Sequence, residues 1–114
     1  GEAMTTEAPV DNGGRGVRFS PTDLVAAALG TCILTIMGKV AERENVDLTG
    51  ATARVEKEMS AAAPRRIAAL TVTIALPAGL ILTPEQQRKF AAVPNACPVK
   101  QSLHPETMVA VKFA

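Results

Sequence analysis

Two cysteines are the residues of this sequence best suited to chemistry. Cys32 lies midway along an apolar, alanine-rich segment that reads SPTDLVAAALGTCILTIMGKVAERE, and Cys97 opens the segment CPVKQSLHP, 65 positions later. This wide spacing fits poorly with a metal knuckle or with a secreted disulfide scaffold. One thiol buried by its apolar pattern and one beside a proline-marked helix start together indicate a redox pair.

Each cysteine also has a simpler interpretation. Cys32 is followed along its helix stripe by small or weakly polar side chains, and the cations Lys39 and Arg43 appear only two and three turns further on. Burial disfavours a thiolate unless a cation reaches it, so Cys32 is either a nucleophile that needs a partner or a small core hydrophobe. A helix N-terminus stabilises a thiolate, which gives Cys97 the better intrinsic electrostatics; its alternative role is a weak helix cap.

The helix that carries Cys32 has a clear start. Ser20 is a typical cap, Pro21 suits the first helical position, and Asp23 stands where a capping-box acid belongs. The stretch 24–40 is apolar nearly all round, which predicts a helix buried on most of its faces. Gly30 and Gly38 within it either allow another element to approach closely or cost helix stability.

The rest of the chain predicts three strands and two further helices. The stretches 51–59 and 66–76 alternate apolar and polar residues, and a hairpin loop over 60–65 joins them. A capped helix starts at Thr83 and runs to about Val93, Cys97 caps a last short helix, and Met108 to Phe113 form a final strand. The order predicts an α+β fold, with an antiparallel sheet packed around one long central helix. The charged run 56–58 is expected to be a solvated face.

Length and composition favour a single domain. The 114 residues are 47% apolar but only 3% aromatic, so small aliphatic side chains must fill a modest core. We expect a domain over residues 20–114, preceded by an exposed or poorly ordered arm over residues 1–19, where turn residues occur without periodicity. Part of the apolar surface is expected to be covered by a second subunit.

Several classes of partner are disfavoured. The net charge is +1 with no basic stripe and no aromatic platform, which argues against nucleic acid. The apolar run 24–37 is expected to be too short for a membrane span, and no signal peptide is evident. Cys32, Cys97 and His104 are the only candidate metal ligands and lack close ligand spacing, so we expect neither metal nor cofactor. Two cysteines without a secretory signal favour a reducing, cytoplasmic compartment.

The two cysteine segments resemble those of the OsmC/Ohr family of thiol-dependent peroxidases, and most closely its general OsmC-like branch. SPTDLVAAALGTC over 20–32 is similar to that family's cysteine-bearing helix, and ACPVKQSL over 96–103 is similar to its second cysteine segment. DNGG at 11–14 and EKEM at 56–59 also fit. The resemblance implies an intertwined homodimer with active sites near the subunit interface, and it implies that the family's N-terminal strands are missing here.

The resemblance also implies a mechanism. Cys32 would attack an organic hydroperoxide and become a sulfenic acid, Cys97 would capture it as a disulfide, and an external dithiol would reduce the bridge. A pocket of Leu29, Ile33, Ile36 and Phe19 is expected to favour organic hydroperoxides over hydrogen peroxide. Such a protein would serve as an antioxidant in a stress response.

Three positions depart from the family pattern. Thr22 stands where family members known as hydroperoxide reductases have a glutamate, ten positions before the first cysteine, with Asp23 adjacent. No residue matches the arginine that activates the thiolate in the family, and Lys100 stands where many relatives have histidine. The alternative is therefore a non-catalytic OsmC-like protein that binds a small apolar ligand, with both cysteines reduced and idle.

Overall fold

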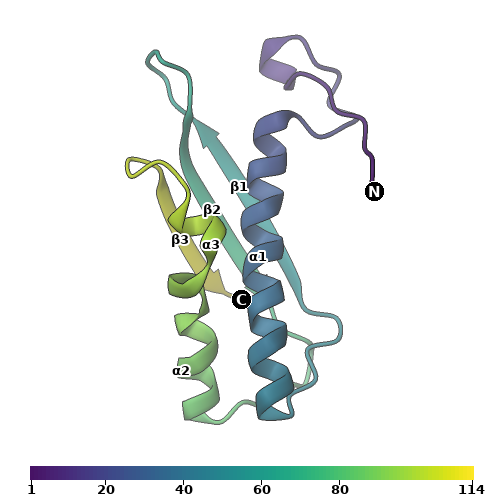
Figure 1. The fold of residues 1–114 in the computed structure, drawn as a ribbon, viewed down its shortest axis with the longest axis vertical. Coiled ribbons are helices and arrows are strands. Elements are labelled where there is room, and N and C mark those ends of the chain that lie inside the picture. Colours follow the sequence, from purple (N-terminus) through teal and green to yellow (C-terminus); the bar gives the residue numbers. More distant parts are fainter.

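The long helix α1 (Pro21–Glu44) is the central element of the fold. The computed structural model describes residues 1–114, and α1 runs nearly the full height of the molecule beside the sheet (Figure 1). The predicted capping box is present: the Asp23 N–H donates to Ser20 Oγ at 3.2 Å, and the Ser20 N–H donates to Asp23 Oδ2 at 3.0 Å. At the other end, Asn45 takes the left-handed conformation that ends a helix.

The sheet contains three strands, β1 (Thr52–Met59), β2 (Ile67–Ala75) and β3 (Met108–Phe113), in the order β1-β2-β3. The strands β1 and β2 form the expected antiparallel hairpin, but β3 pairs with β2 in parallel. The expectation of an antiparallel sheet is therefore wrong for this pair. The chain between β2 and β3 crosses over through helices and returns to the same end of the sheet, which makes the pairing parallel.

The crossover carries the second cysteine. It consists of α2 (Pro84–Ala92), the 3₁₀ turn η2 (Val93–Ala96) and the short helix α3 (Pro98–Gln101), with Cys97 between the last two. All three lie on the same side of the sheet as α1 (Figure 1). The core lies between these helices and the sheet. Its buried side chains include those on the inward face of β2 and those of the helices, as follows: Leu29, Ile33, Met37, Leu70, Val72, Ile74, Phe90, Val93 and Cys97.

The helix α1 is less buried than its composition predicts. Its buried residues form one stripe, which is centred on Leu29, Ile33 and Met37 and faces the sheet and the crossover. The expectation that most of its faces are buried is not met within one chain. The expectation that the apolar run is too short for a membrane is also wrong by length and composition alone, since 18 residues of α1 reach a mean hydropathy of 1.9. The buried stripe makes α1 the core helix of this domain.

The arm over residues 1–19 is largely exposed, as one of the two expected forms has it, and its stretch from Glu7 to Phe19 is an organised loop rather than a poorly ordered one. The Glu7 carboxylate accepts hydrogen bonds from the backbone N–H groups of Arg15, Val17 and Arg18 at 2.8, 2.9 and 2.7 Å. These donors, the Arg15 N–H first, hold the pKa of the Glu7 carboxyl below its usual range. The loop is closed where the Glu7 N–H donates to the Phe19 carbonyl at 3.1 Å. One carboxylate thus supplies the order that the sequence pattern does not show.

The two glycines of α1 differ in what surrounds them. A Cβ atom at Gly30 would lie 2.9 Å from Val55 Cγ2 and 3.4 Å from the Ala53 Cβ, whereas a Cβ at Gly38 would meet nothing within 4 Å. Gly30 therefore allows β1 to approach the helix closely, one of the two roles expected for these glycines. Gly38 has no such neighbour and only weakens the helix.

Candidate functional site

The structure places Cys32 and Cys97 in neighbouring parts of the fold, although 65 positions separate them in the sequence. Cys32 lies at the edge of the buried stripe of α1 and packs against the core cluster that contains Cys97. Helix α1 contacts both η2 and α3, the two elements that flank Cys97. Cys32 contributes, after burial, to the raised pKa of the Cys97 thiol. No disulfide joins them in this structure.

Cys32 is less buried than its apolar pattern predicts, and Cys97 is the more buried of the two cysteines. Cys97 is fully buried, with none of its surface exposed, whereas Cys32 is only half-buried. Cys32 is one residue from the centre of the buried stripe, and one residue is about 100° around a helix, so its side chain reaches the edge of the core. The accessible thiol is therefore Cys32, and Cys97 lies beneath it.

Cys32 opens into a shallow groove between α1 and the segment around Cys97. The groove has a volume of about 610 Å³ and is lined by Ala28, Thr31, Cys32, Thr35, Ile36, Ala96, Pro98 and Val99. None of these side chains is charged. Of the pocket residues expected from the sequence, only Ile36 lines this groove. Leu29 and Ile33 are fully buried in the core, and Phe19 lines a different groove between α1 and β1.

Cys97 caps α3 as predicted, but burial overrides the benefit for a thiolate. The Lys100 backbone N–H donates to Cys97 Sγ at 3.4 Å. Burial first, and the hydrogen bond with Cys32 second, raise the pKa of the Cys97 thiol above its usual value, and the Lys100 N–H offsets this only in part. The expectation that Cys97 has the better electrostatics for a thiolate is therefore wrong, because a four-residue helix cannot offset complete burial.

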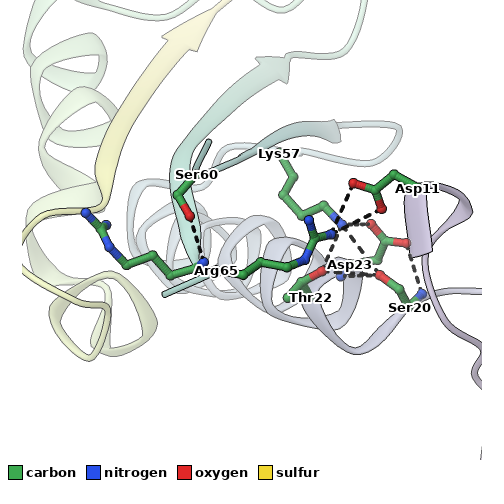
Figure 2. Close-up of polar contacts among 8 residues, drawn as sticks. Asp11, Ser20, Thr22, Asp23, Lys57, Ser60 and Arg65 are labelled. Atoms are coloured by element: carbon green, nitrogen blue, oxygen red, sulfur yellow. Dashed lines mark hydrogen bonds and ion pairs between the residues drawn. The ribbon is translucent and has the colours of Figure 1, made fainter. Parts of the chain in front are cut away.

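Lys57 is the residue near the cysteine helix that sequence reasoning missed. It was expected on a solvated face, but only 15% of its side chain is exposed. Its ammonium donates to Asp23 Oδ1 at 2.8 Å and to Thr22 Oγ1 at 2.9 Å, and it lies 3.5 Å from Ser20 Oγ (Figure 2). The hydrogen bond from Lys57 holds the pKa of the Asp23 carboxyl below its usual range. The sequence did indicate this position, because Lys57 follows Val55 by two residues in a strand and therefore lies on the same, inward face.

This polar cluster joins three segments at the start of α1. Lys57 connects β1 to the helix cap, and Arg65, in the hairpin loop, reaches both oxygens of Asp11 at 3.1 Å in the N-terminal loop (Figure 2). Thr22 lies ten residues before Cys32, which is about 15 Å along a helix. Within one chain, the Lys57 ammonium therefore orients the helix start rather than contacting the Cys32 sulfur.

His104 makes a local contact with the backbone two residues further on. Its Nδ1 accepts a hydrogen bond from the Glu106 N–H at 3.0 Å, and no group of three or more potential ligands is close enough to hold a metal ion. The candidate site therefore consists of the two cysteines and the groove above Cys32.

Comparison with known proteins places the chain in a family. The OsmC-like protein family matches residues 13–112. A crystal structure from Psychrobacter arcticus, of a candidate osmotic stress induced and detoxification response protein, is 40% identical, with a TM-score of 0.86 over 96% of this chain and 77% of that one. The chain belongs to the OsmC-like family. No curated protein matches the sequence.

More distant structures share the fold. An organic hydroperoxide resistance protein OsmC from Legionella pneumophila is 17% identical, with a TM-score of 0.73 over 94% of this chain and 77% of that one. The organic hydroperoxide resistance protein OhrB of Bacillus subtilis is 15% identical, with a TM-score of 0.68 over 86% of this chain and 72% of that one. These two likenesses confirm the predicted α+β fold, with a mixed rather than an antiparallel sheet here. The predicted family is confirmed by the family match over residues 13–112 and by the 40% identical structure.

Proposed function

We propose that this protein is a thiol-dependent peroxidase that reduces organic hydroperoxides with Cys32 and Cys97. The observation that carries the proposal is the difference in solvent access between the two neighbouring thiols. Cys32 faces an open groove, and Cys97 lies buried beside it on the far side from solvent. A peroxide in the groove has access to the Cys32 sulfur, whereas the buried Cys97 sulfur is shielded from it.

The proposed reaction balances in three steps. The Cys32 thiolate attacks the terminal oxygen of the hydroperoxide, the O–O bond breaks, and the alkoxide takes a proton and leaves as an alcohol. Cys97 then attacks the sulfur of the Cys32 sulfenic acid, the S–O bond breaks, and water leaves as the disulfide forms. An external dithiol reduces the bridge by two thiol–disulfide exchanges and becomes a disulfide itself.

The groove above Cys32 favours an apolar substrate. Its walls near the sulfur are alkyl groups from Ala28, Ile36, Ala96 and Val99, with no charged side chain. An alkyl or aryl group removed from water against these walls gains binding free energy that hydrogen peroxide cannot gain. The substrate class proposed is therefore an organic hydroperoxide of modest size.

Thiol counting tests the proposal directly. We expect one equivalent of cumene hydroperoxide to remove both free thiols of the reduced protein, and one equivalent of hydrogen peroxide to do so more slowly. A stopped reaction followed by thiol titration in denaturant measures both. Retention of both thiols after cumene hydroperoxide would contradict the peroxidase and favour the alternative below.

The alternative is a non-catalytic protein that binds a small apolar ligand in the same groove. The absence of any charged side chain in the groove favours it, because a peroxidatic thiolate is usually stabilised by a neighbouring cation. The position ten residues before Cys32 also holds Thr22, which is engaged by Lys57 and is not an acid. In this case the thiols would survive the peroxide treatment.

The open face of α1 supports a homodimer. This face consists of Ala27, Ala28, Thr31, Leu34 and Thr35, none of which is fully buried within one chain. The Thr31 hydroxyl donates to the Ala27 and Ala28 carbonyls at 2.9 and 3.1 Å, and the Thr35 hydroxyl donates to the Thr31 carbonyl at 2.7 Å. Both hydroxyls are thus satisfied within the helix, so the face can be covered by a second copy without leaving unpaired polar groups.

A charge on this face is expected to break the dimer. Thr31→Arg would place an unpaired guanidinium in the interface, which costs several kcal/mol of association free energy. Light scattering after size exclusion, at micromolar concentration, should then report a monomer. Thr52→Arg, at an exposed position on the outer face of β1, serves as the matched control and should leave the mass unchanged. Equal masses for both variants would remove this face as the interface.

The remaining expectations follow from the reaction. A disulfide that must be reduced in every cycle requires a compartment that supplies reduced dithiols, which is the basis for proposing a cytoplasmic location. The partners proposed are a small hydroperoxide, a reducing dithiol and a second copy of the chain. An antioxidant role in a stress response follows from the same chemistry.

A further inference from the structure

Two consecutive arginines at the end of the β1–β2 hairpin bind two different loops. Arg65 donates to both carboxylate oxygens of Asp11 in the N-terminal loop, at 3.1 Å each (Figure 2). Arg66 binds the segment before β3, where its Nη2 donates to Glu106 Oε2 at 2.7 Å. The Arg66 backbone N–H also donates to Ser60 Oγ at 2.9 Å, which holds this arginine against the hairpin loop.

The Arg66 guanidinium is only partly satisfied by its contact with Glu106. Its Nη1 atom is buried without a hydrogen-bond partner, and it is the only buried side-chain nitrogen or oxygen atom in the structure of which this is true. A guanidinium can bind two oxygens of one anion side by side, but the Glu106 carboxylate engages only Nη2. Because a buried donor without an acceptor is unfavourable, this arginine favours a further oxygen acceptor.

A cavity of about 490 Å³ lies beside Arg66. It is lined by the hairpin loop, including Ser60 and Pro64, and by His104 and Glu106 from the segment between α3 and β3. His104 Nδ1 accepts from the Glu106 N–H at 3.0 Å, so the neutral ring carries its proton on Nε2, and no residue accepts from that nitrogen. Arg66 and His104 therefore bring donors without acceptors to one cavity.

We propose that this cavity binds a small oxyanion, a carboxylate or a phosphate group, between Arg66 and His104. The Glu106 side chain, which is 69% exposed, occupies part of the site and gives way to the incoming anion. The anion then accepts from both Nη1 and Nη2 of Arg66 and from His104 Nε2. Carboxylates and phosphates both present two oxygens to a guanidinium in this geometry. Neither cysteine lines the cavity, so the inference is independent of the proposed peroxidase activity.

Titration with sodium phosphate and, separately, with sodium acetate tests the proposal. His104 is the only histidine, so its ring resonances in NMR spectra report on the cavity without ambiguity. The second readout is the midpoint of thermal unfolding, and pH and ionic strength are held constant with sodium chloride. We expect both readouts to change saturably, with a dissociation constant on the order of millimolar. Saturation by phosphate alone would assign the site to phosphate groups, and saturation by acetate alone would assign it to carboxylates.

Three variants locate the binding. Glu106→Gln removes the competing carboxylate and nearly keeps its size, so it should bind the anion about threefold to tenfold more tightly than the parent protein. Arg66→Met should abolish saturable binding. Arg65→Met changes the neighbouring arginine, which does not line the cavity, so it serves as the matched control and should bind as the parent protein does. Thermal unfolding without added anion checks that each variant keeps its fold.

Three results would overturn the inference. The first is an absence of saturable change in both the parent protein and Glu106→Gln, which holds whether or not Arg66→Met folds. The second is equal binding by Arg66→Met and the parent protein, since the anion would then lie elsewhere. The third is equal weakening in Arg65→Met and Arg66→Met, which would assign the effect to net charge. These measurements involve no thiol chemistry, so a protein without peroxidase activity can bind the anion, and a peroxidase can lack the site.

Discussion

Replacement of Cys32 by serine is expected to abolish consumption of cumene hydroperoxide in the presence of a dithiol. A serine hydroxyl in the same groove remains protonated at neutral pH and cannot form a sulfenic acid, so the first step has no nucleophile. A colorimetric assay for residual hydroperoxide measures the effect: its signal should fall with the parent protein and persist with Cys32→Ser. Thr35→Ser, another change in the groove lining that leaves both thiols in place, is the matched control and should keep most of the activity.

The Cys97→Ser variant should behave differently from Cys32→Ser. It should consume one equivalent of hydroperoxide per chain and then stall, because the Cys32 sulfenic acid has no partner thiol within the chain. Trapping with dimedone, detected as an added mass on the Cys32 peptide, would identify the stalled state. Sustained turnover by Cys32→Ser, at the rate of the parent protein, would remove the proposed mechanism entirely.

The second large effect is expected from Phe90→Ala. Phe90 on α2 has 1% of its surface exposed and belongs to the core cluster that also holds Val93 and Cys97. Truncation of a buried phenylalanine creates a cavity and lowers the free energy of unfolding by about 3 to 5 kcal/mol. Urea unfolding followed by circular dichroism measures this loss as a lower midpoint.

Phe19→Ala is the matched control for Phe90→Ala, because Phe19 is half exposed at the groove between α1 and β1. Its truncation should lower the free energy of unfolding by less than about 1 kcal/mol. If the two variants unfolded at the same urea concentration, Phe90 would not be the anchor that holds the crossover to the core. Phe90→Ala should also let thiol reagents reach Cys97, which is otherwise shielded.

The elements of the fold were largely predictable because their signals are local. Ser20, Pro21 and Asp23 mark the start of α1, and the alternation of Leu70, Val72 and Ile74 marks β2 with its buried face. The strand β3 was predicted with the bounds that the structure shows, Met108 to Phe113. Its parallel direction was not predicted, because residue periodicity is the same whichever way a strand runs.

The candidate site was predictable in its two cysteines but not in its environment. The proline-marked start at Pro98 predicted the Cys97 cap, while its complete burial depends on the core cluster, which includes Leu29 and Ile33 from the sequence-distant helix α1. Lys57 was misassigned because charged neighbours suggested a solvated face, although the strand period places it inward with Val55. The loop around Glu7 depends on one side chain that binds backbone groups up to 11 positions away, which no periodic pattern reveals.

Because β3 pairs in parallel with β2, two unequal parts of the chain build the sheet: one supplies the hairpin β1–β2, and the other supplies the single strand β3. A cut in the connection at 77–83 would leave Cys32, α1 and the complete hairpin on one fragment, and Cys97 with the lone strand β3 on the other. The second fragment has no strand of its own to pair with, so its chain can order only by annealing to the first. The two cysteines of the candidate site are therefore brought together only when these two parts of the chain associate.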